Sequence, residues 1–140
     1  MAITQGQCTV FKTNLLKGLE NFNTGTSYTY KIALYTAAAT LDDTTLAYST
    51  DNEVSGTGYT AGGEVLAPTV PLSSSTTAYV SFANVTWNPA SFTARGALIY
   101  NSTTGAAVAV LDFGADKTAT STFTVTFPTA DASNAIIRIS

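Results

Sequence analysis

The sequence predicts an all-β fold, an antiparallel sandwich or barrel, with one helix near the N-terminus. From residue 28 onward, apolar and polar residues alternate with a period of two in short runs, as in strands with one buried face. Turn-forming residues separate these runs at regular intervals. Helical spacing occurs only once, before residue 23, so alternating βαβ units are excluded. A chain of 140 residues has the size of one domain, and we expect a single domain over residues 1–140.

The helix is expected over about residues 8–22. Its apolar residues recur every three to four positions and form one stripe: Val10, Phe11, Leu15, Leu19 and Phe22. Thr9 is the expected N-cap, and stop signals follow at Asn21, Asn23 and Gly25. Gly18 then falls inside the helix, where it costs about 1 kcal/mol relative to alanine.

The strands follow in order from residue 28. In residues 28–36, Tyr30, Ile32 and Leu34 share one face, and in residues 122–128 the alternation of Phe or Val with Thr is complete. Other strands are expected at 76–87, 92–101, 106–114 and 135–140. Turn signals lie between strands, at Asn88-Pro89, 101–105, 114–117 and 128–134.

A glycine-rich segment, NEVSGTGYTAGGEVL at residues 52–66, raises the question of a phosphate site. Its glycines miss the dinucleotide spacing, and no Lys-Ser/Thr pair follows them. Glu53 and Glu64 flank the segment and repel phosphate, while Pro68 and Pro71 forbid a following helix. We therefore expect a mobile or tightly turned segment that leads into an edge strand, where proline is tolerated.

Composition excludes several classes of protein. Only 11% of residues are charged, the net charge is −3, and the six Lys and Arg residues are scattered, so no nucleic-acid site is expected. A single cysteine, Cys8, permits no disulfide within the chain. The start of the sequence lacks the features of a signal peptide, and no apolar run is long enough to span a membrane. We expect a soluble protein made in the cytoplasm.

Catalytic chemistry finds little support. The chain has no histidine, no G-x-S-x-G motif and no zinc ligand set, so we expect no enzyme, no cofactor and no metal. Acids gather at Asp42, Asp43, Asp51 and Glu53. Paired carboxylates could serve a glycosidase or bind calcium, but a solvated acidic loop explains them as well. Asp112 and Asp116 are expected to cap a turn.

Trp87, the only tryptophan, has two interpretations. It lies at the end of an expected strand, just before Asn88-Pro89, where a core residue is common. It could also be an aromatic platform for a sugar or an anchor of a protein interface. With the acids of the loop at 42–53, the first of these exposed roles would give a carbohydrate-binding or hydrolytic sandwich.

Three long stretches resemble a known protein family. They are KIALYTAAATLDDTTLAYSTDNEVSGTGYTAGG, VTWNPASFTARGALIYNSTTGAAVAVLDFG and FTVTFPTADASNAIIRIS, which together cover most of the chain from Lys31 to the end. The sequence is similar to the capsid cement, or decoration, proteins of short-tailed bacteriophages, and its length is similar to that of the family member from a Bordetella phage.

The resemblance implies a non-enzymatic protein with a jellyroll-like β-sandwich. Such a protein sits on the outside of the virion, bridges neighbouring copies of the major capsid protein, and braces the shell against the pressure of packaged DNA. It brings no catalytic residues. A different station on the virion, in the tail or a head fibre, is the alternative. A homo-oligomer is expected, with a two-fold dimer as the default.

Candidate contact residues come from the glycine-rich segment and the helix. The segment offers Thr57, Tyr59 and Thr60, and the helix offers Phe11 and Leu15. Trp87 is the sixth candidate, as an interface anchor. Tyr59 has a second interpretation, as an aromatic residue that folds onto its own core.

Overall fold

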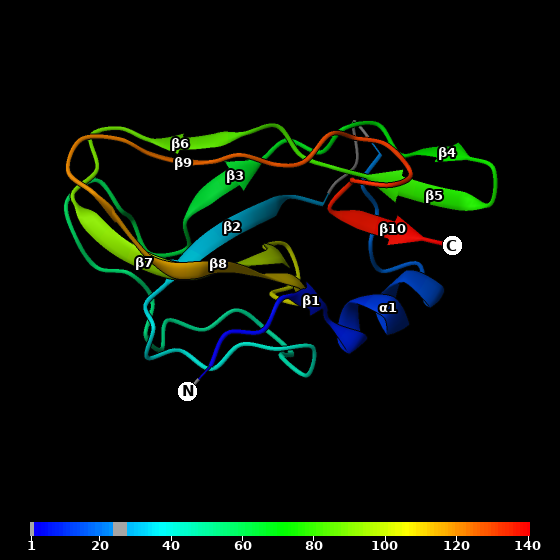
Figure 1. The fold of residues 1–140 in the computed structure, drawn as a ribbon. Coiled ribbons are helices and arrows are strands. Elements are labelled where there is room, and N and C mark those ends of the chain that lie inside the picture. Colours follow the sequence, from blue (N-terminus) through cyan, green and yellow to red (C-terminus); the bar gives the residue numbers. More distant parts are fainter. Residues whose placement is uncertain (1, 24–27) are drawn as a thin grey trace.

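The computed structural model describes residues 2–23 and 28–140, and its architecture is that of an antiparallel β-sandwich with one short helix (Figure 1). The predicted fold class is confirmed. Gly25, expected to help stop the helix, lies outside the described residues. No helix among these residues has the length and apolar character needed to cross a bilayer.

One layer is a five-stranded sheet in the order β1-β8-β7-β2-β3. Its strands are β1 (Gly6–Gln7), β8 (Ala107–Ala119), β7 (Phe92–Asn101), β2 (Tyr30–Tyr35) and β3 (Glu64–Leu66). Strand β7 pairs with β8 on one side and with β2 on the other, and most of its side chains are buried. Strand β3 lies at the edge, as expected for the segment that precedes Pro68.

The remaining strands form two small sheets: in Figure 1, β6 and β9 run above the five-stranded sheet, and β10, β5 and β4 lie at its right-hand end. One has the order β10-β5-β4, from β10 (Ile137–Ile139), β5 (Thr77–Val80) and β4 (Leu72–Ser74). The other pairs β6 (Val85–Trp87) with β9 (Phe123–Val125). The strands thus divide into five, three and two, whereas an idealised jellyroll has two four-stranded sheets.

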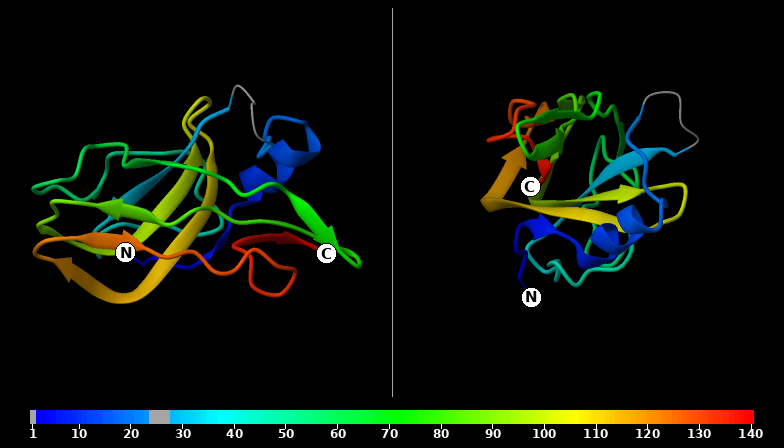
Figure 2. Two further views of the ribbon diagram at one scale, coloured as in Figure 1. Left: turned by 90° about the horizontal axis from the view of Figure 1, so that it is seen from above. Right: turned by 90° about the vertical axis from the view of Figure 1, so that its right-hand side faces the viewer.

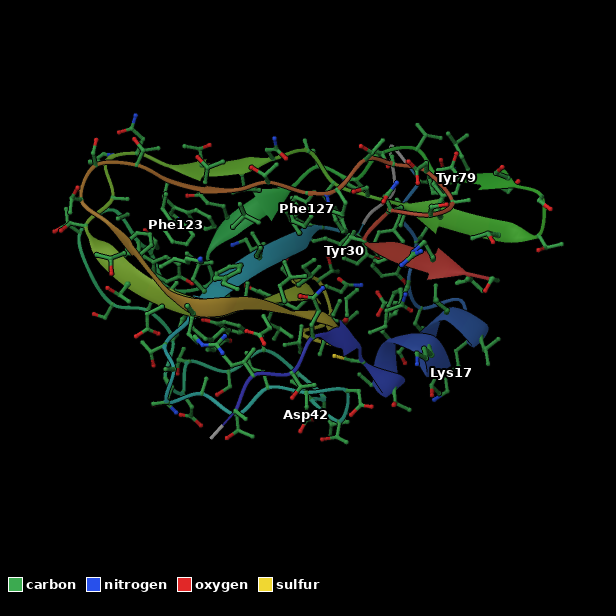
Figure 3. All side chains as sticks on the ribbon, in the orientation of Figure 1. Lys17, Tyr30, Asp42, Tyr79, Phe123 and Phe127 are labelled. Atoms are coloured by element: carbon green, nitrogen blue, oxygen red, sulfur yellow. The ribbon has the colours of Figure 1, made fainter. Side chains whose placement is uncertain are left out.

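Aromatic side chains fill the space between the layers, where Figure 3 shows Phe123 and Phe127. They form two clusters of edge-on, tilted and stacked rings. One cluster comprises Phe11, Phe22, Tyr30, Phe82 and Phe127, and the other comprises Tyr59, Trp87, Phe92, Phe113 and Phe123. Because no disulfide can form in this chain, this packing is the main source of its stability.

The helix α1 (Thr9–Leu16) is shorter than predicted. Gly18 adopts a φ of +72° just after the helix, and the amides of Gly18 and Leu19 donate to the carbonyls of Leu15 and Asn14. This is the Schellman arrangement that ends helices at glycine. The predicted range of 8–22 was therefore wrong beyond residue 16, because Gly18 is the stop signal. The predicted cap was also wrong: Cys8 occupies the N-cap, and Thr9 is the first helical residue.

Two strand predictions also need correction. The expected strand at 76–87 is divided into β5 and β6 by residues 81–84. The expected turn at 114–117 is a bulge inside β8, since Ala94 pairs with Lys117 and Gly96 already pairs with Asp112. Gly114 has a φ of +83° there. The residues that signalled a turn are extra, unpaired residues of the bulge, and the chain continues in the same direction.

Candidate functional site

A groove of about 230 Å³ lies between α1 and the sheet of β10, β5 and β4. These elements gather at one end of the molecule, to the right in Figure 1, and the right-hand view in Figure 2 faces that end. The walls are mostly apolar, with Phe11 and Leu15 on the helix side and Val80 and Ile137 on the sheet side. Glu20 also lines the groove.

The sequence produces both walls by simple periodicity. Phe11 and Leu15 are four residues apart, so they lie on one face of α1 and pack toward the core. On the other side, Val80 pairs with Ile137 and Ala78 pairs with Ile139, so these four side chains share one face of the small sheet. The outer pair, Ala78 and Ile139, is exposed, and the groove therefore opens toward solvent.

Exposed apolar side chains lie near the groove. Leu16 on α1 is 92% exposed, and Leu19, Val70 and Ile139 are about half exposed. Each lines the groove or directly precedes or follows a lining residue in the chain. Exposed apolar side chains beside an apolar groove favour contact with a protein at this end of the molecule.

Glu20 is the unusual polar residue of the groove, since only 7% of its surface is exposed. Its Oε1 accepts hydrogen bonds from the Tyr30 hydroxyl at 3.0 Å and from Asn101 Nδ2 at 2.9 Å. Its Oε2 is buried and has no hydrogen-bond partner among the described residues. Burial raises the pKa of this carboxyl, while the side chains of Asn101, Tyr30 and Asn14, as hydrogen-bond donors, oppose that shift.

The glycine-rich segment is fixed onto the chain's own fold. Glu53 accepts hydrogen bonds from the hydroxyls of Tyr48 and Tyr59 and from the amide of Gly62. The Tyr100 hydroxyl donates to the carbonyl of Gly62 at 2.7 Å. Gly58, Gly62 and Gly63 have positive φ, so the expected tight turns are confirmed.

Tyr59 folds onto the chain's own core, as the second of its two interpretations predicted. Its ring packs against Trp87 and Phe92, and its hydroxyl accepts a hydrogen bond from the Leu34 amide. Burial raises the pKa of this phenol, and its hydrogen bond to Glu53 adds to the shift. Its neighbours Thr57 and Thr60 are exposed, and their role as contacts stays a prediction.

Two other candidate contact residues belong to the core. Phe11 is fully buried, and Trp87 is 2% exposed. Neither side chain can reach a partner on the surface, so we withdraw both as contact residues. Burial of Trp87 also removes the aromatic platform on which the carbohydrate hypothesis depended. Leu15 is partly buried and remains available as a wall of the groove.

The acidic residues serve local structure. Asp42 accepts hydrogen bonds from the amide and hydroxyl of Thr44, which lower the pKa of its carboxyl. Asp112 accepts from the Gly114 amide and pairs with Arg95, and both contacts lower its pKa. Within residues 2–23 and 28–140, no three potential metal-binding side chains of His, Cys, Asp or Glu lie together.

A larger groove of about 500 Å³ lies between β8 and β9. Its polar residues include Asp112 and Thr118, which already bond to Arg95 and Thr93. The two buried side-chain atoms without partners in the described chain, on Glu20 and Trp87, belong to residues outside its lining. The groove beside α1 is therefore the stronger candidate site.

Sequence reasoning found one wall of this groove and missed the rest. Phe11 and Leu15 were visible as a helical stripe, but the small sheet joins segments about 60 residues apart, which no local pattern reveals. Glu20 carried one available signal, because it lies between two apolar residues of the predicted stripe, Leu19 and Phe22.

Comparisons of this chain with protein-family models, with curated proteins and with solved structures find no match. Its function must therefore be inferred from the site and from the sequence resemblance.

Proposed function

We propose that this chain is a capsid cement protein of a tailed bacteriophage, a non-enzymatic protein that binds the outside of the shell and joins neighbouring copies of the major capsid protein. The observation that carries the proposal is the apolar groove beside α1 with its exposed rim. A protein whose most prominent site is an open apolar surface acts by contact with another protein. The sequence resemblance to cement proteins supplies the class of partner.

The composition of the surface supports the same role. Threonine side chains face solvent on paired strands, as at Thr86 with Thr124 and Thr93 with Thr118. Neutral hydroxyls cost less to desolvate than charges, which suits a contact repeated over a lattice. Many identical contacts also make a weak individual contact effective. The protein is expected to act in the virion, as a homo-oligomer with a dimer favoured.

Co-sedimentation with empty mature capsids tests the proposal. The wild-type chain should bind at a fixed copy ratio to the major capsid protein, and particles that lack it should rupture at a lower temperature. Absence of binding, or unchanged rupture, would contradict a cement role. Electron microscopy separates the alternative station, because density confined to the tail or a fibre would replace capsid cement with a tail or fibre module.

Two variants test whether the groove is the contact surface. Leu16→Ser and Ile139→Ser remove exposed apolar side chains from the rim and should each weaken capsid binding about tenfold. Leu46→Ser is the matched control, since Leu46 is also highly exposed but lies outside the groove lining. Equal effects of all three substitutions would show that the capsid contacts some other surface.

A further inference from the structure

The carboxyl group of Glu20 is asymmetric in its contacts. Oε1 is held from the core side by Tyr30 in β2 and by Asn101 at the end of β7. Oε2 has no hydrogen-bond partner among the described residues, although it is buried. Neither Tyr30 nor Asn101 lines the groove, whereas Glu20 does. A buried polar atom left without a partner is uncommon in native proteins and calls for an explanation.

The chain's own cations do not supply that partner. All six Lys and Arg residues belong to the described part of the chain, and the ion pair recorded there joins Arg95 to Asp112. None of the six lines the groove. A buried carboxyl oxygen that lacks a hydrogen-bond partner and belongs to a residue lining an apolar groove favours a cation that arrives from outside.

The size and chemistry of the groove define the occupant further. Its volume of about 230 Å³ is smaller than the roughly 300–1,000 Å³ of typical small-molecule sites, so it suits one long side chain. Lysine combines an apolar stem with a compact cation at its end. Arginine fits less well, because its paired donors seek two free carboxyl oxygens and Oε1 is already engaged twice.

We propose that the groove binds a lysine side chain of a partner protein, with its stem along Leu15, Ala78 and Ile139 and its ammonium group on Oε2 of Glu20. The apolar rim then contacts the residues that flank this lysine. The inference deepens the proposed function, because it rests on the groove as the contact surface and assigns the lysine to the major capsid protein.

A small probe tests the groove without any capsid. The full chain, labelled with ¹⁵N, is titrated with n-hexylamine, which carries an alkyl stem and an ammonium group, and separately with 1-hexanol, its neutral counterpart. The amine should produce saturable chemical-shift changes at Phe22, Val80 and Ile137, with an affinity at least tenfold higher than that of the alcohol. Equal affinities, or no saturable change with the amine, would overturn the proposal.

Matched variants identify the charge that is responsible. Glu20→Gln keeps an oxygen that accepts from Tyr30 and Asn101, so the fold is retained, and it should reduce amine affinity at least tenfold while leaving alcohol binding unchanged. Asp51→Asn removes an exposed carboxyl outside the groove and should change neither. Ile139→Ser should weaken the binding of both probes to the same extent. An unchanged amine affinity in Glu20→Gln would contradict the assignment.

The outcomes also separate this inference from the proposed function. If the wild-type chain binds hexylamine through Glu20 but does not bind capsids, the lysine site is retained and the cement role is lost. If the wild-type chain and the Glu20→Gln variant bind capsids equally well, the cement role is retained and the lysine site is lost.

Discussion

The hydroxyl of Tyr59 donates a hydrogen bond of 2.5 Å to Oε2 of Glu53, and this contact joins the beginning of the glycine-rich segment to its middle. The same carboxyl oxygen accepts from the Gly62 amide at 2.8 Å. Two points of the segment, Tyr59 and Gly62, therefore converge on the side chain of a third, Glu53. These hydrogen bonds hold a segment with four glycines in eight residues in one conformation. The glycines allow the backbone to adopt that conformation.

Tyr59→Phe tests the importance of this contact. The substitution removes a hydrogen bond to a carboxylate and leaves the Leu34 amide without its present acceptor. Since hydrogen bonds to charged groups contribute about 1.5–3 kcal/mol, we expect a loss of that size in the free energy of unfolding. Denaturation by urea, followed by tryptophan fluorescence, measures it.

Tyr79→Phe is the control, because the structure records no hydrogen bond of the Tyr79 hydroxyl to the described residues. It should change the free energy of unfolding by less than about 0.5 kcal/mol. A Tyr59→Phe variant as stable as this control would show that the hydroxyl network does not hold the segment.

Gly63→Ala tests the close approach of the segment to β2. A Cβ at Gly63 would lie 1.7 Å from the carbonyl oxygen of Ile32, and the φ of Gly63 is +79°. Positive φ alone costs a residue other than glycine about 1–2 kcal/mol, and the clash adds about 1–3 kcal/mol more. We expect a correspondingly large loss of stability in urea denaturation, or a failure to yield folded protein.

Gly105→Ala separates the two causes. Gly105 has a similar φ of +84°, but a Cβ there would meet nothing within 4 Å. This variant should therefore lose only the cost of positive φ. Equal losses in the two variants would mean that β2 moves aside easily and that the close approach has no energetic consequence.

Local patterns predicted the elements of this fold better than its site. Strand β7 was predicted at its full length, because its ten residues are mostly apolar and turn signals bound them on both sides. The helix was extended too far because the stripe of α1 continues past Gly18 to Leu19 and Phe22. Phe22 does pack against Phe11, but it reaches the core from the connection that follows the helix.

The groove could not be predicted for a physical reason. Its walls depend on the pairing of β10 with the edge of the 72–80 hairpin, where Val80 pairs with Ile137, 57 positions away in the chain. Glu20 depends on the same tertiary packing. A glutamate in a polar connection looks solvated in the sequence, and only the approach of Asn101 and Tyr30 reveals that it is buried.

The reactivity of Cys8 provides a test of the packing around α1. The thiol is fully buried, and burial, with Asp42 and Asp43 nearby, raises its pKa to about 11. At pH 8 only about one thiol in a thousand would be ionised, and reagents attack the thiolate. We expect labelling by dithionitrobenzoate to be absent in the folded protein and immediate in denaturant. A Cys8→Ala/Ser73→Cys variant, with its thiol on the exposed β4, should react at once, and fast labelling of native Cys8 would contradict the packing described for α1.

The pH dependence of stability tests the state of Glu20. Its pKa is raised above 4.5 in the folded chain, so between 4.5 and the folded pKa the native state binds more protons than the unfolded state. The stability contributed by the protonated carboxyl is thus complete below pH 4.5 and is lost as the pH rises through the folded pKa.

The Glu20→Gln variant should therefore gain free energy of unfolding relative to wild type as the pH rises, measured by urea denaturation between about pH 4 and 8. Asp42, Asp112 and Asp131 have lowered pKa values, so their stabilisation is lost as the pH falls below 3.8 and leaves this window unaffected. Glu64→Gln, at an exposed carboxyl, is the control for a change of net charge. A difference in the free energy of unfolding between wild type and Glu20→Gln that stays constant with pH would show that the Glu20 carboxyl is ionised without cost.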